Sequence, residues 1–168
     1  MNIGSNYLGN NKTEFVLWAP AVETVELKIL SPEPRVVPME MDGECWKKTL
    51  NNCPPSTKYL FRINDGSEHP DPASHYQPEG VHSPSEVVDH SSFKWSDGRW
   101  SNFPLKDYII YEMHIGTFTK GGTYLSAIDK LDYLKELGIT AVELMPVAQF
   151  PGRRNWGYDG VYPFAPQF

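Results

Sequence analysis

The sequence is poor in cysteine. Its 168 residues contain only Cys45 and Cys53, which are too few for the disulfide framework that stabilises small secreted domains. They also lack the neighbouring Cys or His partners with which proteins hold structural zinc. We therefore expect both thiols to be reduced and to pack inside the protein.

The sequence also lacks a long apolar run and an excess of positive charge. No stretch approaches the ~20 apolar residues of a membrane-spanning helix, and the N-terminal MNIGSNYLGN has neither a basic start nor an apolar run. The 15 Lys and Arg side chains are outnumbered by 21 Asp and Glu, which gives a net charge of -6. This is the wrong sign for binding phosphates or anionic lipid. We therefore expect no nucleic-acid partner, no membrane partner and a cytoplasmic location.

The first half of the sequence lacks helical periodicity, and its short apolar runs alternate with turn residues. Val25, Leu27 and Ile29 alternate with Glu26 and Lys28, as in a strand with one buried face and one face in water. Further expected strands are Phe15–Trp18, Cys45–Leu50 and Lys58–Ile63, with Pro20, Pro32, Pro54, Pro55 and the turn Asn64-Asp65-Gly66 in the gaps. This spacing predicts an immunoglobulin-like β-sandwich over residues 1–66.

Residues 67–106 show no sustained periodicity and are rich in Pro, Ser, His and Asp. A structureless connector of this length is unusual inside a compact domain. Tyr76, Phe93, Trp95 and Trp100 are spread along it, which favours an ordered connector held down by its aromatic side chains. The alternative is a disordered linker.

After the connector the pattern changes. Tyr108–Ile115 and Thr140–Val147 are rich in β-forming residues, and Tyr124–Leu137 between them has the periodicity of an amphipathic helix. The apolar stripe of this helix consists of Tyr124, Ala127, Ile128, Leu131, Leu134 and Leu137. Thr123 is placed to cap its start and Gly138 its end. Because a crossover helix returns the chain to the same side of a sheet, the two strands should be parallel neighbours in a βαβ unit.

Longer segments resemble known proteins. YEMHIGTFTKGGTYLSAIDKLDYLKELGITAVELMPVAQFPGRRNWGYDGVYPFAPQ, residues 111–167, is similar to the first β-α-β stretch of an α-amylase-superfamily barrel. Within this superfamily, PGRRNWGYDG (151–160) and DPASHYQPEGVHSPSEVVD (71–89) most resemble the malto-oligosyltrehalose trehalohydrolase family. FVLWAPAVETVELKIL (15–30) resembles the N-terminal sandwich that this family shares with branching enzymes and isoamylases.

The fold that the resemblance implies is a multi-domain β plus α/β protein. The N-terminal sandwich would be followed by an ordered connector over residues 67–106. Residues 107–168 would then form the first βαβ portion of a TIM (β/α)8 barrel, truncated after its second strand.

The resemblance implies a glycoside hydrolase that cleaves the α-1,4 bond next to the terminal trehalose of maltooligosyl trehalose and releases trehalose. It implies no cofactor and no metal, and the expected ligand is maltooligosyl trehalose or an α-1,4-glucan. Enzymes of this superfamily use a carboxylate nucleophile and a carboxylic acid at the C-terminal ends of later barrel strands. This chain ends before those strands, so we expect it to contain no catalytic residue and to hydrolyse nothing alone.

Two alternatives stay open. A glycogen branching or debranching enzyme would share the sandwich and the helix, although branching enzymes usually have a serine before the WGY motif and a glutamine after it. This sequence has Asn155 and Asp159 there. The other alternative is a non-catalytic α-glucan-binding module, in which the sandwich binds and the βαβ segment is an appendage.

The resemblance also suggests substrate-binding residues in the loop after the second barrel strand. The candidates are Asn155, Trp156, Tyr158 and Asp159. Tyr158 is similar to a family tyrosine that stacks on the sugar next to the cleaved bond. The other three are candidates for the same pocket or for holding the loop in shape.

Other polar and aromatic residues favour structural roles. Glu112 and His114 are two residues apart in an expected strand and so share a face, and with Glu143 they favour a hydrogen-bonded polar cluster over an acid–base pair. Trp18 and Trp46 could form a glucan platform, but tryptophan in a strand is more often core. The expected surface residues are His69, His75, His82, His90, Arg153 and Arg154.

A two-stranded parallel unit has unpaired strand edges and a half-covered apolar helix stripe. Both features favour self-association. We therefore expect this part of the chain to associate with itself and the sandwich to be the more stable part.

Overall fold

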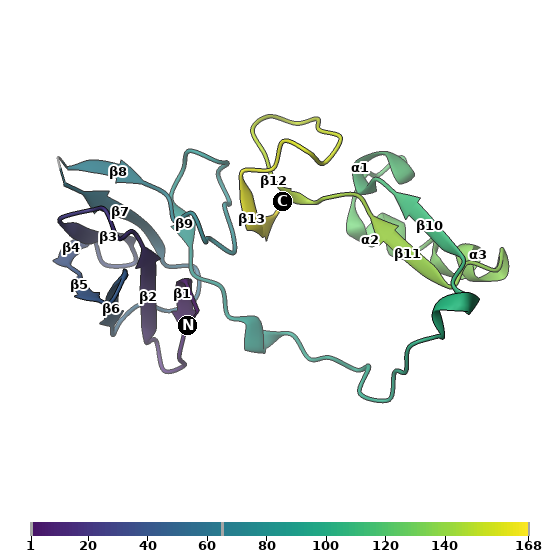
Figure 1. Cartoon of the computed structure of the whole chain (residues 1–168), viewed down its shortest axis with the longest axis horizontal. Helices are drawn as coiled ribbons and strands as arrows, with labels where there is room; N and C mark the ends of the chain where they lie inside the picture. The colour runs from purple at the N-terminus through teal and green to yellow at the C-terminus, as the bar shows by residue number, and fades with distance from the viewer. Residues whose placement is uncertain (1, 65, 168) are drawn as a thin grey trace. The chain divides into compact units, whose positions relative to one another are not determined.

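The computed structural model describes residues 2–64 and 66–167, and its contacts divide the chain into two compact units (Figure 1). The first unit contains the residues up to 92 together with residues 148–153 and 160–168. The second contains residues 93–147 and 154–159. The boundaries expected at residues 66 and 106 separate the sandwich, the connector and the barrel of a whole protein. They stay predictions.

The first unit contains a four-stranded antiparallel sheet. Its strands, in spatial order, are β1 (Gly4–Tyr7), β2 (Thr13–Trp18), β6 (Cys45–Leu50) and β5 (Glu40–Asp42). β2 pairs with β6 along its whole length, from Thr13 opposite Leu50 to Trp18 opposite Cys45. β6 has the predicted bounds, whereas β1 and β5 were not expected from the sequence.

A second antiparallel sheet is built around β3 (Val25–Ser31) and β7 (Lys58–Ile63). Its other strands are β4 (Arg35–Pro38), which pairs with β3, and β8 (Ser67–His69) and β9 (Ser85–Glu86), which pair with β7. The burial of alternate side chains along β3 confirms the predicted pattern. The expected turn before β8 includes Asp65, which lies outside the described residues, and beside it the Gly66 amide donates to the Ile63 carbonyl at 2.8 Å.

The two sheets face each other across one hydrophobic core, which confirms the β-sandwich. The centre of the core is aromatic. Phe15 of β2 meets Tyr59 of β7 edge-on with 4.8 Å between ring centroids, and Tyr59 lies 5.8 Å from Phe61 in the same way. Cys45 and Cys53 are free and buried, as predicted.

The first half of the connector is packed on the sandwich. It contains β9, and its buried residues are Asp71, Ala73, Ser74, Gln77, Val81, Ser85 and Val87. Tyr76 is partly buried, and its carbonyl accepts the Glu86 amide at 3.1 Å. This half of the expected connector therefore lies against the sandwich, through β9 and its buried residues.

The second half of the connector differs from the expectation. It contains the short 3-10 turns His90–Ser92 and Leu105–Asp107. Phe93, Trp95 and Trp100 are 64%, 77% and 69% exposed, so the prediction that these rings hold the segment down is wrong. Phe93 and Trp95 instead meet each other edge-on, with 4.8 Å between ring centroids.

The first unit also contains a short antiparallel pair near the end of the chain, β12 (Ala148–Gln149) and β13 (Tyr162–Pro166). Tyr162 and Ala165 are buried in a cluster with Val81 of the connector. The Tyr162 hydroxyl donates to the Val81 carbonyl at 2.7 Å. β13 is thereby held against the connector segment that packs on the sandwich.

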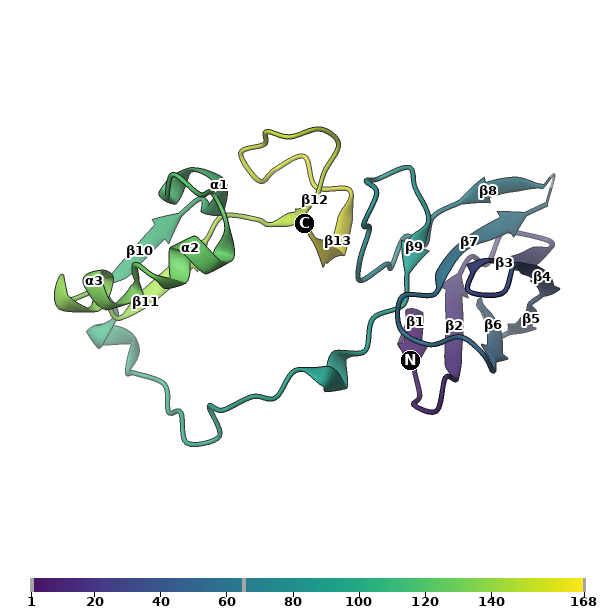
Figure 2. The ribbon, with the colours of Figure 1, turned by 180° about the vertical axis from the view of Figure 1, so that it is seen from behind.

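The second unit is a βαβ arrangement. Its elements are β10 (Ile110–Met113), α1 (Ile115–Phe118), α2 (Tyr124–Ile128), α3 (Leu131–Glu136) and β11 (Ala141–Leu144). β10 and β11 pair in parallel, with Ile110 opposite Ala141 and Met113 opposite Leu144, which confirms the predicted neighbours. Figures 1 and 2 show α2 and α3 on one face of this pair.

The prediction of a single helix over Tyr124–Leu137 is wrong, because the chain forms two short helices separated at Asp129 and Lys130. The predicted cap at Thr123 is confirmed: its hydroxyl accepts the Ser126 amide in a capping box. Only Ala127 and Leu134 of the apolar stripe are buried. Across residues 2–64 and 66–167, no helix has the length and apolar character that crossing a bilayer requires.

Candidate functional site

The candidate site residues lie in the loop of residues 154–159, in the second unit. Asn155 organises this loop through its side chain. Its Oδ1 atom accepts hydrogen bonds from the backbone amides of Gly157 at 2.5 Å and of Asp159 at 3.4 Å. A side-chain oxygen that binds an amide two residues ahead closes a tight turn without help from a strand ladder.

The loop is anchored to the rest of its unit at two points. His114 Nε2 lies 2.6 Å from the backbone carbonyl of Asn155. On the other side, Gly157 has a φ of +103°, and a Cβ built on it would lie 2.7 Å from the Pro146 carbonyl oxygen. Only glycine fits this approach without a backbone shift.

The two aromatic candidates extend away from these anchors. Trp156 is 78% exposed and Tyr158 is 72% exposed, and Asp159 is also exposed. Asn155 is partly buried, and its Oδ1 atom is used by the loop itself. The structure thus brings the four candidates together on one short loop, and their contact with a substrate stays a prediction.

The polar cluster expected around Glu112 is not formed in this chain. Glu112 and Glu143 are aligned across β10 and β11, and both are exposed. β10 ends at Met113, so His114 lies outside the strand, where it precedes α1 and does not share a strand face with Glu112. Among the residues that the structure describes, no hydrogen bond joins these three side chains.

The histidines of the connector are exposed except for His75. The His75 ring is half-buried and lies 4.7 Å from that of His90 and 6.4 Å from the Phe164 ring. Burial, followed by the nearby His90, lowers the pKa of His75. The prediction of a surface residue is therefore wrong for His75. Arg153 and Arg154 are exposed, as expected.

The two sandwich tryptophans differ. Trp46 is 8% exposed and donates from Nε1 to the Ala19 carbonyl at 3.2 Å, so the prediction of a core residue is confirmed. Trp18 is 58% exposed, and the same prediction is wrong for it. The indole Nε1 of Trp18 donates to Glu44 Oε2 at 3.2 Å, which fixes the orientation of an exposed ring.

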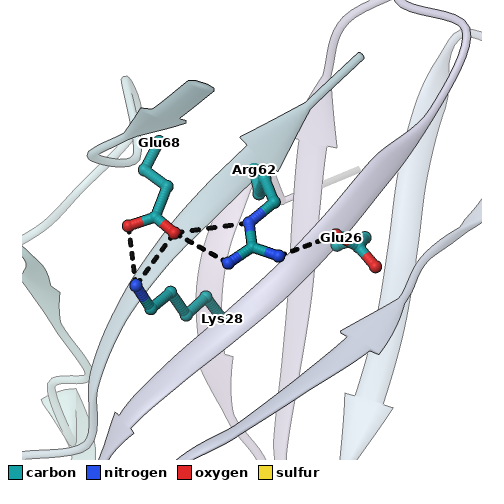
Figure 3. A network of polar contacts seen from close by, with 4 residues as sticks. All are labelled: Glu26, Lys28, Arg62 and Glu68. Atoms are coloured by element: carbon teal, nitrogen blue, oxygen red, sulfur yellow. Dashed lines mark hydrogen bonds and ion pairs between the residues drawn. The ribbon is translucent and has the colours of Figure 1, made fainter. Parts of the chain in front are cut away.

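The outer face of β3, β7 and β8 carries a network of ion pairs (Figure 3). Glu68 accepts from Lys28 at 2.7 Å and from Arg62 at 2.9 Å, and Arg62 also donates to Glu26 at 3.4 Å. Lys28, followed by Arg62, lowers the pKa of Glu68. Because two acids face two bases, this surface has no charge of one sign to attract an anionic or cationic ligand.

An open hollow of about 410 Å³ adjoins this network in the first unit. Its lining is Thr24, Val25, Glu26, Pro38, Met39, Trp46, Arg62, Ile63, Asn64 and Gly66. The lining combines apolar side chains with one acid, Glu26, and one base, Arg62, a combination that suits an uncharged polar ligand. Within residues 2–64 and 66–167, no group of three or more His, Cys, Asp and Glu side chains is placed to hold a metal ion.

Sequence reasoning missed two residues that the structure brings forward. His114 was assigned to a strand, and its bond to the Asn155 carbonyl joins residues far apart in the chain. Asp71 was not singled out, although it is fully buried. Neither residue has a sequence signal of its own. For the turn that His114 contacts, the sequence offered one signal, the Asn-x-Gly pattern at Asn155 and Gly157, which is typical of a tight turn.

Comparison with known families identifies the first part of the chain. Residues 2–77 match the family described as carbohydrate-binding module 48, the isoamylase N-terminal domain. This range covers the strands of both sandwich sheets except β9, and the start of the connector.

Known relatives match nearly the whole chain. Malto-oligosyltrehalose trehalohydrolase from Saccharolobus solfataricus is 48% identical over 95% of this chain, and that from Deinococcus radiodurans is 43% identical over 94%. A 1,4-alpha-glucan branching enzyme from Pseudoalteromonas atlantica is 31% identical over 92%. The chain spans only 28%, 26% and 24% of the lengths of these relatives.

Solved structures also superpose on nearly the whole chain. A Salmonella typhimurium protein assigned as an alpha amylase superposes with a TM-score of 0.90 at 41% identity, over 98% of this chain and 28% of that one. A pullulanase from Anoxybacillus sp. LM18-11, complexed with maltotetraose, gives a TM-score of 0.84 at 28% identity, over 99% of this chain and 29% of that one. Over nearly its whole length the chain is therefore similar to malto-oligosyltrehalose trehalohydrolases, of which it spans about a quarter, and its residues 2–77 match the carbohydrate-binding module.

Proposed function

We propose that this chain is the N-terminal part of a glycoside hydrolase that cleaves the α-1,4 bond next to the terminal trehalose of maltooligosyl trehalose. In this proposal β10 and β11 are the first two strands of a (β/α)8 barrel, and the loop of residues 154–159 lies at its substrate-binding end. Later strands supply the carboxylates that cleave the bond. The chain alone hydrolyses nothing.

The observation that carries the proposal is the exposed pair Trp156 and Tyr158 on an anchored loop after β11. Trp156 and Tyr158 are 78% and 72% exposed, so both rings are open to contact with a ligand. A sugar ring has an apolar face that stacks on an aromatic ring, while its hydroxyls remain free for hydrogen bonds. The identity of 48% to a trehalohydrolase supports the choice of substrate.

The experiment that tests this function compares the 168-residue chain with a version extended along its reading frame through the later barrel strands. Both are incubated with maltooligosyl trehalose and with the maltooligosaccharide of the same length. We expect the extended protein to release trehalose from the first substrate and the short chain to release nothing. Hydrolysis by the short chain, or transfer of glucan segments without release of trehalose, contradicts the proposal.

The second candidate function is α-glucan binding by the sandwich itself. The observation that favours it is Trp18, an exposed ring whose orientation is fixed by Glu44. Titration of the chain with maltoheptaose separates the two ideas. Binding that Trp18→Ala abolishes and Tyr158→Ala preserves supports the sandwich, and the opposite result supports the loop.

A further inference from the structure

The loop of residues 154–159 is fixed before any ligand arrives, and one side chain from outside the loop contributes to this. His114 lies between β10 and α1, with extended backbone angles of φ -98° and ψ 116°. Its ring lies over Gly116, where a Cβ would come within 3.0 Å of the ring Cε1 atom. The absence of a side chain at Gly116 leaves room for the ring in this position.

The chemistry of the contact assigns its direction. The Asn155 backbone carbonyl can only accept a hydrogen bond, so His114 Nε2, 2.6 Å away, must carry the proton. His114 Nδ1 is buried without a hydrogen-bond partner among the described residues. The tautomer protonated at Nδ1 would therefore bury an unpaired N–H and leave the Asn155 carbonyl facing a bare nitrogen.

The bond from His114 is continuous with the turn inside the loop. The carbonyl that His114 binds belongs to the residue whose Oδ1 atom holds the Gly157 amide. Gly157 in turn lies against the Pro146 carbonyl. The backbone at residues 155 and 157 is thus held from both sides, and the intervening and following residues, Trp156 and Tyr158, are the exposed ones.

We propose that His114 is a positioning residue that holds the loop so that Trp156 and Tyr158 are ordered for contact with an α-glucan. This inference rests on the function proposed above. Holding two aromatic rings in place before binding removes part of the entropy loss that a mobile loop would suffer when the ligand binds. Asn155 then serves the same purpose from within the loop, and its side chain is not itself a sugar ligand.

A pair of substitutions at His114 tests this role. Glutamine can place an amide N–H where the imidazole has Nε2, whereas phenylalanine keeps a flat ring but cannot donate. The readouts on the full chain are hydrogen exchange of the Gly157 and Asp159 amides and the affinity for maltoheptaose. For His114→Phe we expect faster exchange at both amides and an affinity about 3- to 10-fold weaker, the equivalent of one lost hydrogen bond. His114→Gln should stay close to wild type in both.

Two controls separate positioning from folding and from ligand contact. The Met145 amide donates to the Met113 carbonyl at 3.0 Å, so its exchange reports whether the β10–β11 pair remains folded in the variants. Tyr158→Ala should weaken maltoheptaose binding without changing exchange at Gly157. Nitrogen NMR of the wild-type imidazole should show the proton at Nε2, a readout that needs no variant.

Three outcomes overturn the inference: an Nδ1–H tautomer, exchange rates unchanged in His114→Phe, or a failure of His114→Gln to preserve them. If wild-type chain binds no maltoheptaose, the glucan contact proposed for the loop fails. The tautomer and the exchange rates still decide in that case whether His114 holds the loop.

Discussion

Asp71 is a charged side chain with no solvent exposure in the first unit. Tyr59 donates to its Oδ2 atom at 2.6 Å, and the Ala73 amide donates to Oδ1 at 2.8 Å. Burial nevertheless raises the pKa of Asp71 from 3.8 to about 6, because these two bonds offset only part of the lost hydration. Burial, followed by Asp71, also raises the pKa of Tyr59 well above its ordinary value.

This carboxyl makes the stability of the sandwich depend on pH. A pKa that is higher in the folded than in the unfolded chain means that the folded chain binds the proton more tightly. The contribution of Asp71 is therefore complete below pH ~4 and lost as pH rises through about 6. A pKa change from 3.8 to about 6 corresponds to roughly 3 kcal/mol.

We expect Asp71→Asn to remove this dependence, because an amide resembles the protonated acid. Urea unfolding of both proteins between pH 4 and pH 7.5 measures it. The stability of the variant relative to wild type should increase across that interval by up to roughly 3 kcal/mol. A difference that stays constant with pH means that Asp71 is not the titrating group.

The sandwich tryptophans should respond very differently to truncation. Trp46→Ala removes a ring that is 8% exposed and leaves the Ala19 carbonyl without its donor, so we expect a loss of about 3–5 kcal/mol of unfolding free energy. Trp18→Ala removes a ring that is 58% exposed and should cost less than about 1 kcal/mol. Urea unfolding at neutral pH measures both, and equal costs would contradict the assignment of Trp46 alone to the core.

At the scale of elements, the strands were predictable where local pattern and tertiary packing agree. β6 and β7 have the predicted bounds, because turn residues flank both strands, and along β7 Tyr59 and Phe61 are buried on one face. β1 could not be found in this way, since Gly4–Tyr7 has no apolar alternation and exists through its pairing with β2. The parallel pair β10–β11 was predictable from the crossover rule.

The helical segment between those strands shows that local periodicity does not determine where a helix ends. The apolar stripe extends through Asp129 and Lys130, but there the Lys130 amide binds the Ala127 carbonyl, three residues back, at 3.0 Å. Such tightened bonds end α2 before α3 begins. Two strands cover only part of the stripe, so Ile128 and Leu137 remain 57% and 60% exposed. The site loop was located by resemblance alone, since its anchor at His114 depends on contacts distant in sequence.

The loop of residues 154–159 should not tolerate a side chain at Gly157. Gly157→Ala combines a φ of +103° with a Cβ 2.7 Å from the Pro146 carbonyl oxygen, which we expect to cost about 1–3 kcal/mol locally and to release the turn. Exchange of the Asp159 amide should then accelerate. Gly152→Ala is the matched control, with a φ of +89° but no atom within 4 Å of its Cβ. Equal exchange in the two variants would show that the Pro146 contact does not hold the loop.

At the scale of the whole molecule, the first unit is assembled from segments distant in sequence. Residues 148–153 and 160–168 belong to it, although the second unit intervenes. The first residues of the second unit include Phe93, Trp95, Trp100 and Phe103, all more than half exposed. Exposed chain without strands or long helices is where proteases cut first.

We therefore expect chymotrypsin to cut first between residues 93 and 106, and the two pieces to remain together afterwards. They are joined within the first unit by the buried Tyr162, whose hydroxyl binds the Val81 carbonyl at 2.7 Å. Size exclusion of the cut protein, with mass spectrometry of the peak, measures this. Tyr162→Ala should let the pieces separate, whereas Phe164→Ala, which removes a ring that is 52% exposed, should not. Separation of the wild-type pieces would mean that the contacts of β12 and β13 are too weak to hold the end of the chain to the sandwich.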